Sequence, residues 1–230
     1  MPSQNVTGET AGAEGYSNLK VWLRDIAPVA PGAVRSVVKR QLRLACREFF
    51  GESFAWRGAL GPINVVGGTA TYALSPFNSY TDVIGVLAVE QNGVPLNPLF
   101  RKPSPFPGVL ANNFNTDFPK GYYMLRPDIL SLYPPPTNPL PNPLTLQVYV
   151  ALKPKPSCEQ VPLIAQTDFY EPILCGVLYR LLNQPAKPYS NPALAGYYEK
   201  RFRSYIGQFA GRAKTGFNGA ASWSFPGFGK

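Results

Sequence analysis

Apolar residues recur at intervals of three and four from Val34 to Phe49, the spacing of a helix with one buried face. Pro31 suits the first turn of such a helix. A second stripe runs beside the apolar one at four-residue steps and is basic: Arg35, Lys39, Arg43 and Arg47. This stripe is either a solvated helix face or an electrostatic contact with DNA or a neighbouring subunit.

The middle of the chain has the two-residue period of β-strands. Asn92-Gly93 follows one such run and predicts a tight hairpin, while Arg126-Pro127-Asp128 predicts a second reversal. Leu144 to Leu152 alternates apolar residues with others and predicts a strand with one face on a core. The β-type segments expected are 63–74, 83–90, 122–133 and 144–152.

Helical spacing returns in the last third of the chain. Asp168 and Glu171 stand three apart, like a capping box, and predict a helix that runs from Asp168 to about Asn183. Ser190-Asn191-Pro192 is a start signal for a third helix, whose apolar side continues to Phe209.

Beyond Gly211 the chain is rich in glycine and aromatic residues and cannot pack a core of its own. Large aromatic groups of this kind suit the pockets of a partner. The alternative is a tail that folds back on its own domain. The candidate docking residues are Phe217, Trp223, Phe225 and Phe228.

Together these elements predict an α+β fold, in which a small helical bundle carries an inserted antiparallel β domain and extended termini. The bundle is expected to combine one N-terminal helix with two C-terminal helices. The Pro-rich segment from Leu96 to Pro119 is too long for an idle connection, so we expect it to cover or contact something. The expected divisions are a flexible arm at 1–18, the bundle at 19–60 and 160–212, the β domain at 61–158 and the aromatic tail at 213–230.

Composition narrows the classes of function. The 26 Pro and 21 Gly in 230 residues argue against a long-helix protein. A net charge of +9 favours contact with polyanions such as nucleic acid or an acidic protein surface. The N-terminus lacks a signal pattern and no long apolar run follows, so we expect an untargeted, soluble intracellular product without a membrane partner.

The residue types of common catalytic sites are missing. The chain has no histidine, which excludes Ser-His and Cys-His nucleophiles. Cys46, Cys158 and Cys175 lack metal-site spacing and are expected to be buried free thiols. Gly67-Gly68-Thr69 matches no phosphate-binding loop, so a bend or bulge is expected there. We therefore expect no catalytic residue, no cofactor and no metal.

The order of elements, a helix, a β insertion and two further helices, resembles the head-to-tail adaptor (connector) proteins of tailed bacteriophages. The likeness rests on order and spacing together. The segments that carry it are the helix from Pro31 through Arg47-Glu48-Phe49-Phe50 to Trp56, the strand pair Gly121-Tyr122-Tyr123 and Ile129 to Pro134, the strand Leu146 to Pro154, and the helix Ala193 to Phe202.

This resemblance implies a structural virion protein at the head-tail junction, made in the cytoplasm of the bacterial host. It implies a homo-oligomeric ring, typically of twelve copies, which binds the portal protein, joins a tail or nozzle protein and lets double-stranded DNA pass. The alternative function is a monomeric, sequence-independent nucleic-acid-binding protein, in which the positive charge and the Tyr and Phe groups grip a backbone.

Overall fold

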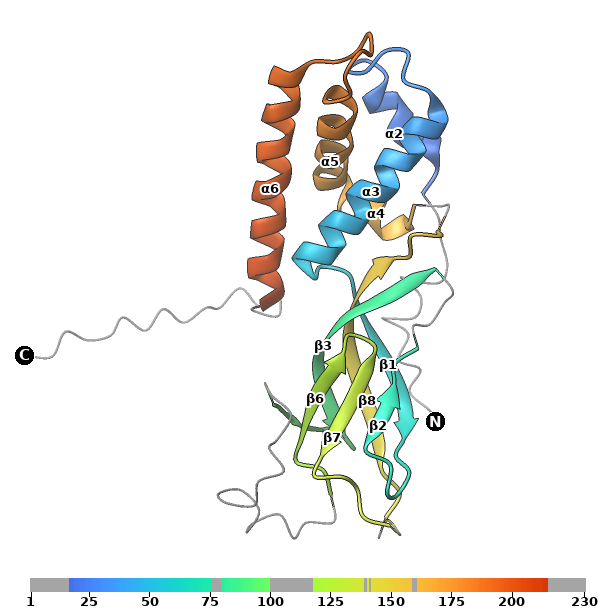
Figure 1. The fold of residues 1–230 in the computed structure, drawn as a ribbon, viewed down its shortest axis with the longest axis vertical. Coiled ribbons are helices and arrows are strands. Elements are labelled where there is room, and N and C mark those ends of the chain that lie inside the picture. Colours follow the sequence, from blue (N-terminus) through green and yellow to red (C-terminus); the bar gives the residue numbers. More distant parts are fainter. Residues whose placement is uncertain are drawn as a thin grey trace, which may run out of the picture.

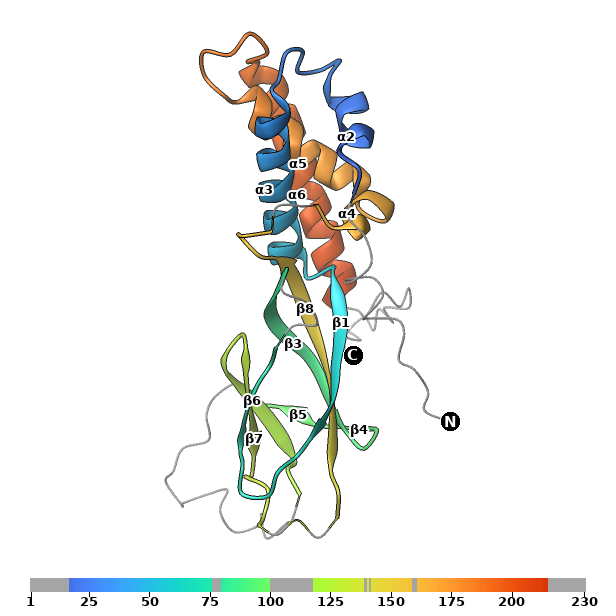
Figure 2. The ribbon, with the colours of Figure 1, turned by 90° about the vertical axis from the view of Figure 1, so that its right-hand side faces the viewer.

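The computed structural model describes residues 17–75, 80–99, 118–138, 140, 142–158 and 161–214. Helices occupy one end of the molecule and β-strands the other, so that the molecule is elongated (Figure 1 and Figure 2). The expected α+β fold is confirmed. Most of the expected arm, most of the Pro-rich segment and all four candidate docking aromatics lie outside the described residues.

The helical end is built around α5, which packs against both α3 and α6. Gly176 of α5 allows the close approach, because a Cβ at this position would lie 2.7 Å from the Phe202 ring and 3.0 Å from the Ala45 Cβ. The helices of the described chain are α2 (Leu19–Ile26), α3 (Arg35–Ser53), α4 (Leu163–Thr167), α5 (Tyr170–Leu182) and α6 (Pro192–Lys214).

An aromatic cluster around Phe49 of α3 forms the centre of this bundle. Its ring centroid lies 5.3 Å from that of Phe169, just before α5, and 6.3 Å and 5.6 Å from those of Phe202 and Phe209 on α6. Phe49 and Phe202 are fully buried. The cluster therefore connects α3, the start of α5 and α6. Aromatic pairs at such separations stabilise the fold beyond the contribution of the apolar area that they bury.

Two sheets form the other end. One has the strand order β1-β8-β3-β4 and the other β2-β7-β6-β5; the paired strands are antiparallel except for β5 and β6. The strands are β1 (Arg57–Asn64), β2 (Thr71–Ala73), β3 (Thr81–Gln91), β4 (Val94–Pro95), β5 (Asn97–Pro98), β6 (Gly121–Arg126), β7 (Ile129–Tyr133) and β8 (Thr145–Pro154). Strand β8 alternates between buried and half-buried residues along most of its length, as the sequence predicts.

Both predicted hairpins are confirmed. Asn92 and Gly93 have φ of 47° and 82° and connect β3 to β4, which is the backbone that an Asn-Gly turn adopts. Pro127 and Asp128 connect β6 to β7. Gly68, with φ of 78°, lies in a turn between β1 and β2, so the predicted bend is also present.

Several element boundaries differ from the prediction. Helix α3 begins at Arg35, so Pro31 lies in the preceding loop, and β1 begins at Arg57, inside the stretch assigned to the bundle. Helix α6 continues to Lys214, past the expected start of the tail. The short helix α2 was not predicted, although Trp22 and Ile26 bury one side of it and Asn18 caps its first turn.

The capping-box prediction is wrong. Asp168 is the C-cap residue of α4, and α5 begins only at Tyr170 without a side-chain cap. The acidic group of Glu171 forms an ion pair with Arg201 of α6 instead. A carboxylate in the first turn of a helix is stabilised by the helix dipole whether or not it takes part in a capping box. The spacing of Asp168 and Glu171 therefore did not determine which group Glu171 binds.

Candidate interaction surfaces

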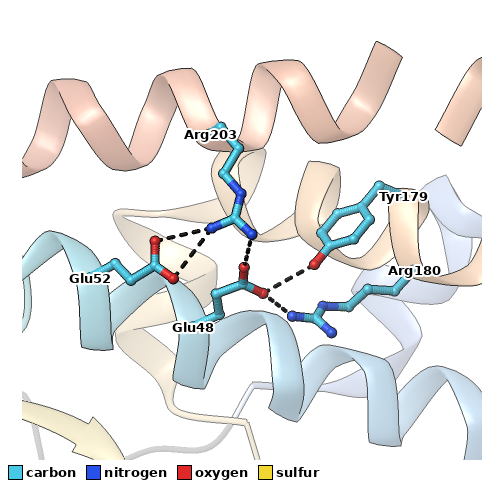
Figure 3. Close-up of polar contacts among 5 residues, drawn as sticks. All are labelled: Glu48, Glu52, Tyr179, Arg180 and Arg203. Carbon is cyan, nitrogen blue, oxygen red and sulfur yellow. Dashed lines mark hydrogen bonds and ion pairs between the residues drawn. The ribbon is translucent and has the colours of Figure 1, made fainter. Parts of the chain in front are cut away.

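Glu48 joins the three main helices through charged contacts (Figure 3). This α3 carboxylate is 14% exposed and lies 2.7 Å from Nη2 of Arg203 on α6. On α5, Arg180 forms a close ion pair with it, and the Tyr179 hydroxyl donates to its Oε2 at 3.1 Å. Glu52 forms a second ion pair with Arg203, with 3.0 Å between its Oε2 and Nη1 of the arginine. Because Glu48 is largely buried, its arginine partners offset the cost of keeping it charged.

Burial changes the protonation equilibria around this group. Desolvation, together with the nearby positive charge of Arg203, lowers the pKa of Arg180. Burial also raises the pKa of Tyr179, which keeps its hydroxyl protonated and able to donate to Glu48. Glu48 accepts hydrogen bonds from side chains of α5 and α6, so this group of contacts stabilises the packing of these two helices on α3.

The basic stripe on α3 is divided by the structure. Arg43 donates to the carbonyl of Cys158 at 3.3 Å, and Arg47 donates to the carbonyl of Pro154. Arg47 also lies 4.0 Å from Asp82 of β3. These two residues therefore hold the connection between β8 and α4 against α3.

The first two members of the stripe lie farther from this connection. Arg35 is exposed at the start of α3, and Lys39 is half-buried. Contact of the stripe with DNA or a neighbouring subunit stays a prediction. Arg35 is the member best placed for such a contact, because Arg43 and Arg47 already bind carbonyl groups of this chain.

Arg201 organises a second surface, on the outer side of α5 and α6. It donates to the hydroxyl of Tyr205 at 2.9 Å and to that of Tyr197 at 3.3 Å, and it forms an ion pair with Glu171. Tyr197 is 52% exposed. Tyrosine and arginine with fixed side chains are enriched where proteins bind each other. Sequence analysis did not identify this group, although the four-residue steps from Tyr197 to Arg201 and Tyr205 were visible.

The end of α6 is attached to the β region. Arg57 of β1 donates from Nη2 to the carbonyl of Ala213, and burial lowers the pKa of this guanidinium. The last carbonyls of a helix lack partners within the helix and carry partial negative charge, so a guanidinium suits this position. The contact places the C-terminal end of α6 beside the start of β1.

A pocket of about 540 Å³ lies at the far end of the β region. The β3–β4 hairpin forms one side of it through Val94 and Leu96, and Phe118 and Leu144 contribute further apolar groups. Gln91 also lines it, and the Oε1 of Gln91 is buried with no hydrogen-bond partner among the described residues. The sequence contained no pattern that predicted this pocket, because its walls come from separate segments.

The described residues offer little for metal or thiol chemistry. No group of three His, Cys, Asp or Glu side chains in this part of the chain is placed to hold a metal ion. The three cysteines are free and buried, as predicted. Burial raises the pKa of Cys175 to about 11 and raises that of Cys46 as well, so neither is a ready nucleophile. Within the described residues, no helix is both long and apolar enough to cross a membrane.

Comparison with known families identifies the class of the protein. The sequence model of the SU10 adaptor protein family matches residues 17–223. The chain belongs to this family. Membership agrees with the resemblance to phage adaptors found from the order of elements, and it indicates a structural role in the virion. No curated protein matches the chain.

Proposed function

We propose that this SU10 adaptor family protein forms a homo-oligomeric ring that connects the portal of the capsid to the tail. The resemblance to head-to-tail adaptors implies about twelve copies in the ring. In this role it occupies the head-tail junction of the virion and gives passage to double-stranded DNA. The observation that carries the proposal is the family match over residues 17–223. It covers both the helical bundle and the β region.

The shape of the molecule supports a connecting role. The helices and the strands lie at opposite ends of an elongated chain (Figure 2). An adaptor has to contact two different proteins, and two ends of different structure provide two different surfaces. A head-to-tail contact between identical copies closes into a ring when the rotation between them allows it.

The distribution of charge supports passage of DNA past the helical end. Segments 17–56 and 161–214 contain fourteen Lys and Arg against six Asp and Glu. Several of these basic groups, including Arg35, Arg40 and Lys200, are exposed. Exposed basic groups attract the phosphate backbone without reading sequence.

Two groups of residues are proposed contacts. The stripe Arg35, Lys39, Arg43 and Arg47 is proposed to face DNA or a neighbouring subunit, with Arg35 as the member free of the carbonyl contacts that hold Arg43 and Arg47. Docking on the portal or on an adjacent subunit is proposed for Phe217, Trp223, Phe225 and Phe228. Removal of residues 215–230 should then abolish assembly and leave folding intact.

The mass of the purified protein in solution tests the function directly. Light scattering of the protein alone, and of the protein mixed with the portal of the same phage, is combined with electron microscopy of any large species. Rings on the portal are the expected result. A persistent monomer that ignores the portal and binds oligonucleotides with strong salt dependence would instead support the monomeric nucleic-acid-binding function.

A further inference from the structure

We propose that in the free subunit the pocket at the far end of the β region holds the aromatic tail, residues 215–230, of the same chain, with Trp223 as the inserted group. The inference goes beyond the proposed function, because it concerns the chain before any contact with a portal or another copy forms. It follows from the chemistry of the pocket, the position at which α6 ends and the length of chain that follows.

The pocket lies between the far ends of the two sheets. Gln91 is the last residue of β3 and Leu144 directly precedes β8, so one wall belongs to the first sheet. Asn97 of β5 and Lys120, directly before β6, belong to the second sheet. The volume of about 540 Å³ is in the range of sites that enclose a ligand of several rings. The pocket is therefore large enough for an aromatic segment.

The chemistry of the pocket suits an uncharged segment. Apolar side chains, including Val94, Leu96 and Phe118, line it, and Lys120 is the only charged residue among the described residues that do so. The tail carries no charge from Thr215 to Gly229 and contains four aromatic residues. Such a segment enters an apolar pocket without the cost of desolvating an ion.

Gln91 supplies a polar partner for the tryptophan. Its Oε1 is buried and has no hydrogen-bond partner within the described residues, and a buried acceptor without a partner costs free energy. Trp223 is the only aromatic residue of the tail with a hydrogen-bond donor. Its indole N–H only donates, and an amide oxygen only accepts. Insertion of Trp223 therefore satisfies both groups.

The end of α6 lies at a moderate distance from the pocket. Arg57 of β1, which binds the carbonyl of Ala213, pairs with Ala151 of β8. Gly85 of β3 pairs with the same residue, and Gln91 lies six residues farther along β3. Strands β1 and β3 are two strand spacings apart, because β8 lies between them. These two components give a straight-line separation of about 22 Å.

The tail is long enough to cross this distance. Nine residues lead from Lys214 to Trp223, and an extended chain of this length spans at most about 30 Å. Most of these residues are small, and a flexible linker of nine residues has a root-mean-square end-to-end distance of about 17 Å. The long side chains of Trp223 and Gln91 bridge part of the remaining separation.

The short tether favours the tail of the same chain over that of another copy. A tethered group reaches an effective concentration in the millimolar range when the length of its linker is close to the distance that it has to span. In dilute solution a second copy offers its tail at a far lower concentration. The pocket of a free subunit therefore binds its own tail first, and the tail has to leave the pocket before it docks on a portal or on an adjacent subunit.

An engineered disulfide tests the contact. Val94→Cys places a thiol at the pocket, on a residue that is 64% exposed, and Ser222→Cys places a second thiol beside Trp223. The three natural cysteines are buried and do not compete. Under mild oxidation the pair should close within one chain, at a rate that does not depend on protein concentration. Disulfide-linked dimers instead of this product would assign the pocket to another copy and overturn the proposal.

The matched control keeps both thiols and removes the inserted group. In the same double-cysteine chain, Trp223→Ala should lower the effective concentration of the thiol pair at least about tenfold, measured at equilibrium in a glutathione buffer. Equal values with and without Trp223 would mean that the tail passes the pocket without entering it. That result would also overturn the proposal.

Tryptophan fluorescence locates the inserted group in the natural chain. Trp22 and Trp56 are buried, and the variant Trp223→Phe gives their emission alone. The emission of Trp223, obtained as the difference, should resist quenching by acrylamide. Val94→Glu places a charge in the pocket and should increase this quenching several-fold. The control is Val66→Glu, since Val66 is 59% exposed and does not line the pocket; quenching should not change. Equal quenching of Trp223 in the natural chain and in Val94→Glu contradicts the insertion.

A double-mutant cycle tests the polar contact. In the double-cysteine chain, Gln91→Leu removes the acceptor, and Trp223→Phe keeps an aromatic ring but lacks the N–H. Gln91→Leu should lower the effective concentration of the thiols several-fold when Trp223 is present and leave it unchanged in Trp223→Phe. Equal losses in both backgrounds would refute the hydrogen bond to Gln91.

The disulfide also separates this inference from the proposed function. A tail locked in the pocket is not available elsewhere, so the oxidised chain should form no rings on the portal, and reduction should restore them. Rings on the portal from a reduced chain that never closes the disulfide would overturn this inference and leave the adaptor function standing. An intrachain disulfide in a chain that forms no rings even after reduction would do the reverse.

Discussion

Arg57, the first residue of β1, donates a hydrogen bond to the carbonyl of Ala213 in the last turn of α6, although the two residues are 156 positions apart in the sequence. The contact holds the beginning of the β region against the end of the bundle. Helix α6 therefore ends at the junction of the two parts, away from the loop that connects α5 to α6 at the other end of the bundle (Figure 1).

Removal of the charge of Glu48 should destabilise the protein strongly. In Glu48→Gln, Arg180 and Arg203 lose the carboxylate that compensates them, and a free energy of unfolding lower by about 3 kcal/mol is expected. Urea denaturation measures the change. The control is Glu52→Gln, whose side chain is 50% exposed and whose loss should cost less than about 1 kcal/mol. Similar losses for both variants would contradict the central role of Glu48.

Gly176 should tolerate no side chain. In Gly176→Ala the new Cβ would lie 2.7 Å from the Phe202 ring, so helices α5 and α6 have to separate, at a cost of about 1–3 kcal/mol. Gly207→Ala on α6 is the matched control, because nothing lies within 4 Å of its Cβ position. It should raise stability by about 0.5–1 kcal/mol through helix propensity. Thermal unfolding of the two variants should shift in opposite directions.

Stability should fall at alkaline pH. Burial, and then the hydrogen bond to Asp25, raise the pKa of Tyr170 to about 12, from an ordinary value near 10. The unfolded chain therefore releases this proton first, so the contribution of Tyr170 is complete below pH 10 and is lost between about pH 10 and 12. The free energy of unfolding of Tyr170→Phe should decrease less steeply in this range. Identical slopes for the variant and the natural chain would refute the assignment.

Substitutions in the basic stripe of α3 should have two different effects, because Arg47 binds a carbonyl group of this chain and Arg35 is exposed. Arg47→Gln removes the donor to the Pro154 carbonyl and should lower the free energy of unfolding by about 1–2 kcal/mol. Arg35→Gln should change it by less than about 0.5 kcal/mol, because Arg35 is exposed. Retention of DNA in the assembled particle should respond to Arg35→Gln if the stripe faces the channel. Unfolding curves and genome retention are measured on the same pair of variants.

Features that depend on neighbours in the sequence could be predicted well. Asn92-Gly93 determines its turn through backbone angles that these residues adopt easily, and the hairpin is present. Asn191 is a helix start signal in the sequence, and its side chain accepts a hydrogen bond from the Leu194 amide at 3.1 Å. The apolar face of β8 was likewise visible as a two-residue alternation.

Features that depend on residues far away in the sequence could not be predicted in this way. Asp168 and Glu171 match a capping box, but Arg201, 30 residues after Glu171, binds that carboxylate. Arg43 and Arg47 look like a surface stripe, yet each donates to a carbonyl more than a hundred residues away. A periodic pattern shows which side of a helix a residue occupies, and it contains no information on the chain that packs there.

The sequence by itself determined the order of the three main helices and the longer strands, the two hairpins and the lack of histidine, because turn conformation, periodicity and composition are local or summed properties. Only the tertiary structure decided that Glu48 joins three helices, that α6 ends against Arg57 and that a pocket forms beside Val94 and Phe118. Each of these requires side chains from separate segments to meet, and their meeting depends on how the whole core packs.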